Sequence, residues 1–407
     1  MSESASYLEA IFVVGLTIVA VMLIKAAASR VGVPALVGYI ALGCGLCVVD
    51  NRVGLSTQTG RILEFLAKVG VITLLFRIGL ESKLRSLLHQ LRRASLVWIG
   101  DVMASGGLTF VACRWLIGLE LIPSLFTAVA MTATSVGVSV AIWRGQNALD
   151  TPRGQMLIDV AELDDISGIT LMALLFAIAP VLHQSGDASL GSALAATSLL
   201  LLGKLIAFGA LCILFSLYLE ERITCFFERV VPSPDPMLVV VGIGFVIAAV
   251  AELLGFSFAI GAFFAGLAFS RDPDAIKFDA SFKTLYELFS PFFFIGIGLA
   301  VTFGAVGDAL LLGILLVLVA FIGKFIGDGI TAASFMSTGA AATLAVSMTP
   351  RAEIAMIVMG HGMALGEWAV PPELYAASVM VVLATCIVAP IVVQKMLQKH
   401  PPKNGGS

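Results

Sequence analysis

The stretch DVAELDDISG, residues 159–168, places two adjacent carboxylates, Asp164 and Asp165, inside an apolar run from residue 156 to 181. A run of this length can cross a bilayer as a helix. Ionised carboxylates in hydrocarbon are costly, so a membrane helix that carries two of them is expected to use them. Consecutive helical residues point about 100° apart, so the two acids face different surroundings. One can therefore contact a partner helix while the other lines a wet cavity.

The composition is that of a membrane protein. Hydrophobic residues make up 59% of the 407 residues and only 13% are charged. These proportions predict an all-α polytopic membrane protein. We expect about 13 transmembrane helices, from apolar runs near residues 9–28, 32–49, 63–80, 95–117, 123–143, 155–181, 192–217, 234–250, 255–270, 284–301, 306–332, 338–365 and 371–396. The net charge of -3 and the lack of a basic tract indicate no nucleic-acid partner.

The charged residues between the runs predict the orientation. An odd number of spans puts the termini on opposite sides of the membrane. The loops after the odd-numbered runs hold most of the Lys and Arg, whereas the other side holds only Arg52 and Arg61 beside several acids. Because basic loops stay in the cytoplasm, we expect the N-terminus outside and the C-terminus in the cytoplasm.

Several ionisable residues lie within the apolar runs. Asp164, Asp165 and Lys324 are too far from a helix end to reach the membrane surface. We therefore expect Lys324 to pair with one aspartate, so that the other binds and releases a ligand. An alternative is that both aspartates only hold helices together, but one lysine does not neutralise two acids. The other ionisable residues within the runs are Lys68, Arg77, Asp101, Asp159, Glu162, Lys204, Asp328, Arg351 and Glu353.

Two spans carry residues that interrupt a helix. Residues 131–138, MTATSVGV, crowd hydroxyl and small side chains into mid-span, where they compete with the backbone ladder. Residues 347–353, SMTPRAE, include Pro350, which breaks or kinks a helix. The arrangement predicts an inverted repeat in which half-helix ends offer carbonyls and dipoles to an ion. A packing kink at each place is the alternative.

Six motifs occur in order: LLFRIGLE at 74–81, ATSVG at 133–137, DD at 164–165, PFFF at 291–294, GK at 323–324 and MTPRAE at 348–353. Over nearly the whole chain they resemble bacterial sodium/proton antiporters of the monovalent cation/proton antiporter superfamily, in the branch with adjacent aspartates. The resemblance implies two crossed discontinuous helices, a homodimer in the bacterial inner (plasma) membrane, and elevator-like movement of a core. It also implies a transporter with a role in pH homeostasis, which is neither an enzyme nor dependent on a cofactor.

The resemblance further implies a division of the chain. Residues 1–400 would form the exchanger domain and residues 401–407 a cytoplasmic tail. We expect a core subdomain at approximately 95–217 and 306–396, and a dimerisation or gate subdomain at approximately 9–80 and 234–301.

Site roles also follow from the resemblance. Asp165 resembles the ion-binding carboxylate that would hold Na⁺, and Asp164 resembles the acid paired with Lys324. Thr134 and Ser135 lie in the first interrupted segment, where hydroxyls and carbonyls could replace the water of an ion.

The second interruption resembles a structural or gating element. It contains Pro350, and we expect Arg351 and Glu353 to form an ion pair there.

Four positions depart from the family pattern. Arg77 stands where an apolar residue is usual, and Glu162 adds an acid before the aspartate pair. Ala352 replaces a glycine. Asp328 lies four residues after Lys324, so it could compete with Asp164 for the lysine on one helix face. We regard Arg77, Glu162 and Asp328 as candidates that modulate ion preference, stoichiometry and pH response.

These features together predict exchange of a monovalent cation, Na⁺ or Li⁺, for H⁺ by alternating access. Sodium prefers oxygen ligands, and a proton or a cation can each neutralise the same carboxylate, so the two compete. A K⁺/H⁺ antiporter of the potassium-efflux type is the main alternative. An ion channel or uniporter is a further one, but it would need a continuous pore or a carbonyl filter.

Overall fold

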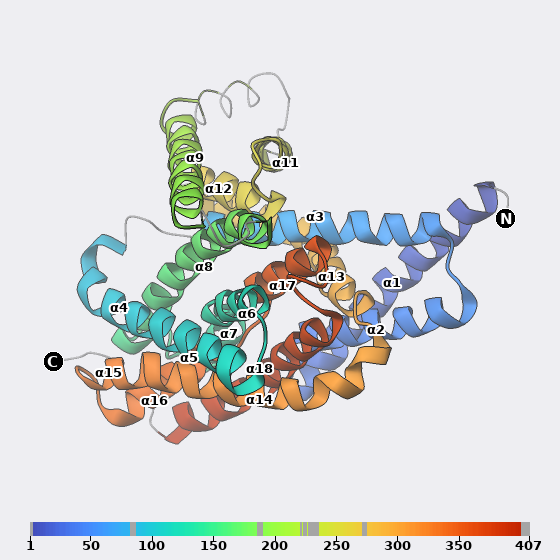
Figure 1. The fold of residues 1–407 in the computed structure, drawn as a ribbon. Coiled ribbons are helices and arrows are strands. Elements are labelled where there is room, and N and C mark those ends of the chain that lie inside the picture. The colour runs from blue at the N-terminus through green and yellow to red at the C-terminus, as the bar shows by residue number, and fades with distance from the viewer. Residues whose placement is uncertain are drawn as a thin grey trace. The chain divides into compact units, whose positions relative to one another are not determined.

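The structure is a computed structural model that describes residues 3–81, 87–184, 190–219, 222, 226, 236–270 and 275–399. The described residues form helices and no strand, which confirms the predicted all-α class (Figure 1). Eight helices in these ranges are long and apolar enough to cross a membrane, and shorter apolar helices accompany them. The number of 13 spans stays a prediction. The expected tail at 401–407 lies outside the described residues.

The chain divides into two compact units. Unit 1 comprises Met1–Ala28, Gly38–Leu84 and Ala195–Ala300, and unit 2 comprises Ser29–Val37, Arg85–Leu194 and Val301–Ser407. Residues 195–217, which we had placed with the core subdomain, group with unit 1. The roles of core and dimerisation subdomain stay predictions.

Unit 1 is built around α3, which packs against α12 and α13. Its helices are α1 (Glu3–Val31), α2 (Ala35–Val53), α3 (Thr57–Glu81), α9 (Leu190–Tyr218), α11 (Pro236–Leu253), α12 (Phe258–Phe269) and α13 (Ala275–Leu299). Glycines allow α3 and α12 to touch: a Cβ atom on Gly79 would lie 2.1 Å from the Phe263 carbonyl oxygen, and one on Gly266 would lie 2.0 Å from that of Phe76. The glycine of the LLFRIGLE motif is therefore a packing requirement.

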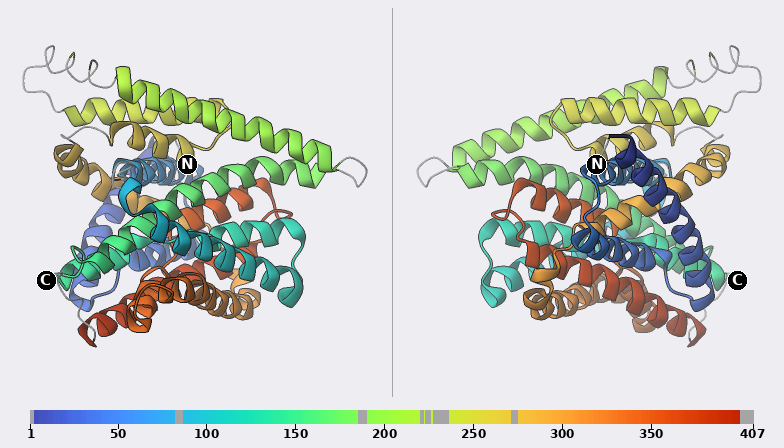
Figure 2. Two further views of the ribbon diagram at one scale, coloured as in Figure 1. Left: turned by 90° about the vertical axis from the view of Figure 1, so that its left-hand side faces the viewer. Right: turned by 90° about the vertical axis from the view of Figure 1, so that its right-hand side faces the viewer.

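Unit 2 holds both predicted interruptions. Its elements are α4 (Leu87–Asp101), the π-helical η1 (Val102–Gly106), α5 (Gly107–Val111), the π-helical η2 (Ala112–Ile117), α6 (Leu121–Thr132), α7 (Val136–Gly145), α8 (Pro152–Gln184), the 3₁₀ turn η3 (Phe303–Ala305), α14 (Val306–Lys324), the π-helical η4 (Phe325–Ile330), α15 (Thr331–Ala333), α16 (Thr338–Ser347), α17 (Glu353–Leu365) and α18 (Pro372–Lys399). The long helices α14 and α18 pack along one another (Figure 2).

The two interrupted spans cross. The first breaks between α6 and α7, where Ala133 adopts an extended conformation, and the second breaks between α16 and α17. The Ser135 backbone N–H donates to the Pro350 carbonyl at 2.8 Å. The Ser139 hydroxyl donates to the Ser347 carbonyl at 2.6 Å. Backbone groups that the breaks leave without a helical partner thus bond across the crossing, which confirms the two crossed discontinuous helices.

A buried apolar cluster sets the position of α8 beside this crossing. Five members of this cluster are each at most 1% exposed: Val97 of α4, Trp143 of α7, Leu157 of α8, Met348 in the second interruption, and Val393 of α18. The Trp143 indole also donates to the Ser347 hydroxyl at 2.9 Å. The helix with the aspartate pair is therefore held against both interruptions.

Candidate ion-exchange site

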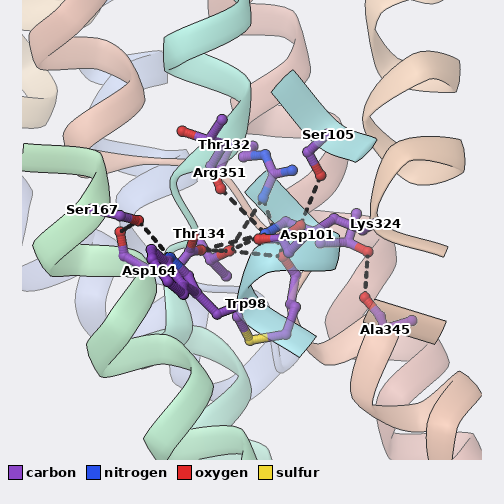
Figure 3. Close-up of polar contacts among 12 residues, drawn as sticks. Trp98, Asp101, Ser105, Thr132, Thr134, Asp164, Ser167, Lys324, Ala345 and Arg351 are labelled. Carbon is purple, nitrogen blue, oxygen red and sulfur yellow. Dashed lines mark hydrogen bonds and ion pairs between the residues drawn. The ribbon is translucent and has the colours of Figure 1, made fainter. Parts of the chain in front are cut away.

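The Thr134 hydroxyl is the meeting point of the site, because the first interruption turns it toward three charged residues. It donates to Asp164 Oδ2 at 2.5 Å. It accepts from Lys324 Nζ at 2.7 Å and from Arg351 Nη1 at 3.3 Å. The Met348 carbonyl lies 3.1 Å from the same hydroxyl as a second acceptor. One hydroxyl can donate one bond and accept two, so these contacts use its whole capacity. Figure 3 shows the four side chains pointing toward one another.

Lys324 is completely buried and lies between two carboxylates. Its ammonium contacts Asp101 most closely, and it lies 3.3 Å from Asp164 Oδ2, the partner we expected. It also donates to the Thr132 carbonyl at 3.2 Å. Asp101 was missed as a site residue by the sequence analysis, which placed it only among the ionisable residues of the spans. Its position in mid-span was the available signal, because such an acid needs a partner.

The contact between Asp101 and Lys324 depends on a close crossing of two helices. A Cβ atom on Gly327 would lie 2.6 Å from the Asp101 Cα, and one on Gly323 would lie 3.0 Å from the Ser105 Cα. Both helices become π-helical at this point, in η1 and η4, and such turns are frequent at functional sites. The Ser105 hydroxyl donates to Asp101 Oδ1 at 2.8 Å, which orients the carboxylate toward the lysine.

The two acids of the DD motif differ in environment, as helical geometry requires. Asp164 is fully buried, whereas Asp165 is partly exposed. Oδ2 of Asp164 accepts from Thr134 and Lys324, while its Oδ1 has no hydrogen-bond partner among the described residues. The Trp98 indole donates to the Ser167 hydroxyl at 2.8 Å, and that hydroxyl donates to the Asp164 carbonyl at 3.0 Å. These bonds tie α8 to α4 next to the pair.

The second interruption contacts the first. Arg351 is fully buried, and its Nη1 donates to the Met348 carbonyl at 3.1 Å as well as to Thr134. Glu353 interacts with the side chain of Ser135. The expected ion pair between Arg351 and Glu353 is absent from the described residues, because each side chain turns to the first interruption instead.

The three residues that we regard as modulating candidates lie in different parts of the structure. Arg77 lies in unit 1, where its Nε is 2.7 Å from Glu81 Oε1 and its guanidinium lies over the Tyr286 ring. Glu162 lies partly buried on α8. Asp328 is fully buried, and both of its carboxylate oxygens lack a hydrogen-bond partner in the described part of the chain. The competitor of Asp164 for Lys324 is therefore Asp101 and not Asp328, because π-helical turns after Lys324 change the face on which residue i+4 lies.

The site has the chemistry of an ion-exchange centre. Three carboxylates, from Asp101, Asp164 and Asp328, are 0% exposed, as are the cationic groups of Lys324 and Arg351. The interrupted spans add hydroxyl and carbonyl oxygens beside these charges. Such oxygens can replace the hydration shell of a hard cation, and binding such an ion changes which charges are paired.

Comparisons with known proteins agree with this description. A solved structure, that of the sodium proton antiporter MjNhaP1 from Methanocaldococcus jannaschii, has a TM-score of 0.71 over 97% of each chain, at 15% identity. The Na⁺/H⁺ antiporter of Enterococcus hirae is 29% identical over 96% of this chain and 99% of that protein. The Na⁺/H⁺-K⁺ antiporter GerN of Bacillus cereus is 27% identical over 94% of this chain and 95% of that protein.

The fold is thus similar to that of this solved structure, and two discontinuous helices cross in the described part of the chain. The sequence pattern of the family described as "Sodium/hydrogen exchanger, transmembrane" matches residues 16–399. The chain belongs to this family of transporters.

Proposed function

We propose that this protein exchanges Na⁺ for H⁺ by alternating access, with the two ions competing for the aspartate pair. The observation that carries the proposal is the buried cluster of Asp164, Thr134 and Lys324 at the crossing of the two interrupted spans. Family membership and the similarity to Na⁺/H⁺ antiporters support the same activity. No cofactor enters the exchange; the cation and the proton are the transported species.

Asp165 is the carboxylate that we assign to the sodium ion. It is partly exposed, unlike its neighbour Asp164, which makes it the more accessible of the two carboxylates. Sodium needs several oxygen ligands, and we assign the additional ones to the first interruption, at Thr134 and Ser135. A proton on the same carboxylate would remove the charge that holds the cation, which couples the two ion gradients.

Lys324 compensates for the charge of Asp164 while the site is empty. Its closest partner is Asp101, so it keeps an anionic neighbour if it moves away from Asp164. A buried lysine with two alternative carboxylates can shift between them without ever being left unpaired. Asp101 therefore lowers the free-energy cost of breaking the contact between Lys324 and Asp164.

The test is transport in proteoliposomes with an internal pH-sensitive dye. We expect sodium-driven proton movement by the wild type and none by Asp165→Asn. The matched control is Asp159→Asn, which makes the same substitution at a buried position of the same helix and should retain transport. Robust sodium-driven proton movement by Asp165→Asn would refute the assignment of the site.

K⁺/H⁺ exchange is the second candidate function, because the name of the relative GerN includes potassium as well as sodium. Adding Na⁺, Li⁺ and K⁺ in turn to the same proteoliposomes separates the two activities. We further propose a homodimer in a bacterial inner membrane, with the C-terminus in the cytoplasm. The basic loops after the odd-numbered runs support this orientation of the chain. Labelling of single introduced cysteines from each side of the membrane tests this orientation.

A further inference from the structure

Asp328 is a buried carboxyl group that the proposed exchange does not use. It lies in the π-helical η4 and is 0% exposed. Neither of its oxygens has a hydrogen-bond partner among the described residues. A buried carboxylate without hydrogen bonds is strongly destabilised, and a group in this situation usually becomes neutral. The side chain therefore needs a ligand that removes its charge.

The charges around Asp328 come from several elements. Asp101 at the end of α4 and Asp164 on α8 are negative, whereas Lys324 at the end of α14 and Arg351 in the second interruption are positive. The other elements packed against η4, namely η1, α15 and α16, contain no ionisable residue. These four groups therefore account for the charged surroundings of Asp328.

Neither nearby cation forms a hydrogen bond with Asp328 among the described residues. Lys324 donates to Asp101, Thr134 and Asp164 and to a backbone carbonyl. Arg351 directs Nη1 at Thr134 and at a carbonyl, while its Nε and Nη2 have no hydrogen-bond partner among the described residues. If Asp101 and Asp164 are ionised, they balance Lys324 and Arg351. A third negative charge on Asp328 would have no counter-charge in this cluster.

A proton is the ligand that satisfies Asp328 most simply. It neutralises the carboxyl group by itself, whereas a sodium ion would need several additional oxygens around the same side chain. A neutral Asp328 leaves two anions and two cations in the buried cluster. Charge balance and the lack of a hydrogen bond to either oxygen of Asp328 thus lead to the same protonation state.

We propose that Asp328 is a second proton-binding residue, which holds a proton while Lys324 contacts Asp101 and Asp164. When a cation binds at the aspartate pair and Lys324 leaves Asp164, its ammonium becomes available to a carboxylate at Asp328. The O–H bond of Asp328 then breaks and its proton leaves to water, while the incoming cation replaces that charge. This release step rests on the proposed function, but the protonated state of Asp328 does not.

Infrared spectroscopy of the purified full-length protein tests the protonated state directly. At neutral pH without sodium, we expect a carbonyl band of a protonated carboxyl group, and we expect Asp328→Asn to lose it. Asp308→Asn, the same substitution at an exposed position of α14, should keep the band. A wild-type protein without such a band at neutral pH would overturn the proposal, whether or not the variant folds. So would a well-folded Asp328→Asn variant with an unchanged spectrum.

Proton release on sodium addition tests the second step. With a pH dye and protein in detergent, we expect Asp328→Asn to release one proton fewer per bound sodium ion than the wild type. Equal release by both would overturn the coupling of Asp328 to cation binding while leaving the infrared result intact. Failure of sodium to release any proton from the wild type would instead count against the proposed exchange itself.

Discussion

Replacement of Lys324 by methionine tests the reading of the buried charge cluster. The ammonium is 0% exposed and has four acceptors: Asp101, Thr134 at 2.7 Å, the Thr132 carbonyl at 3.2 Å and Asp164 at 3.3 Å. Methionine fills a similar volume but leaves two buried carboxylates without their cation. Removing one partner of a buried ion pair costs about 3–5 kcal/mol. We therefore expect Lys324→Met to lower the free energy of unfolding by about this amount and to abolish transport.

Lys324→Met is combined with a second variant, Asp101→Asn, in a double-mutant cycle. Asp101→Asn removes the closest counter-charge of Lys324 but leaves Asp164. We expect it to cost less than Lys324→Met, because the lysine keeps one carboxylate and the amide oxygen can still accept its hydrogen bond. The double variant should be more stable than Lys324→Met alone, since it carries one uncompensated acid fewer. Contacting residues of this kind show interaction energies of about 0.5–3 kcal/mol.

The assay measures unfolding of the purified protein in detergent. The protein is unfolded by a denaturant titration or by heating, and intrinsic fluorescence monitors the transition. Lys204→Met is the matched control, because Lys204 is exposed on α9 and its loss should change stability little. Strictly additive losses in the double variant would refute the direct coupling of Asp101 to Lys324. A Lys324→Met variant as stable as the wild type would show that the lysine carries no buried charge pair.

Two further predictions concern the geometry around this lysine. Thr134→Val removes the hydroxyl between Asp164, Lys324 and Arg351. We expect it to lower the free energy of unfolding by about 1–3 kcal/mol and to raise the sodium concentration for half-maximal transport. Thr134→Ser, which keeps the hydroxyl, should restore both values. Gly327→Ala would place a Cβ atom 2.6 Å from the Asp101 Cα and should cost about 1–3 kcal/mol and slow transport. Gly360→Ala, whose Cβ would meet nothing within 4 Å, is the control; equal stability of the two alanine variants would contradict the close crossing.

Much of the fold was predictable because a membrane leaves few choices. Backbone groups in hydrocarbon must be paired within the segment, so long apolar runs form helices. Local chemistry also located the two interruptions: hydroxyl residues around Thr134 and the proline at Pro350 disfavour a continuous helix wherever the span packs. That Asp164 and Asp165 point in different directions follows from helical geometry alone.

The partners of the buried charges depended on the tertiary structure. Asp101 and Lys324 are 223 residues apart in sequence, and they meet because Gly323 and Gly327 allow two helices to cross closely at π-helical turns. The i, i+4 spacing suggested a contact between Asp328 and Lys324, but π-helical turns follow the lysine and the described residues form no such ion pair. The amino-acid sequence by itself determined which charges lie within the apolar runs, but not which of them are buried, since Lys204 is exposed and Lys324 is not. Only the packing of distant segments decided which of those charges touch, since that depends on which helix faces meet.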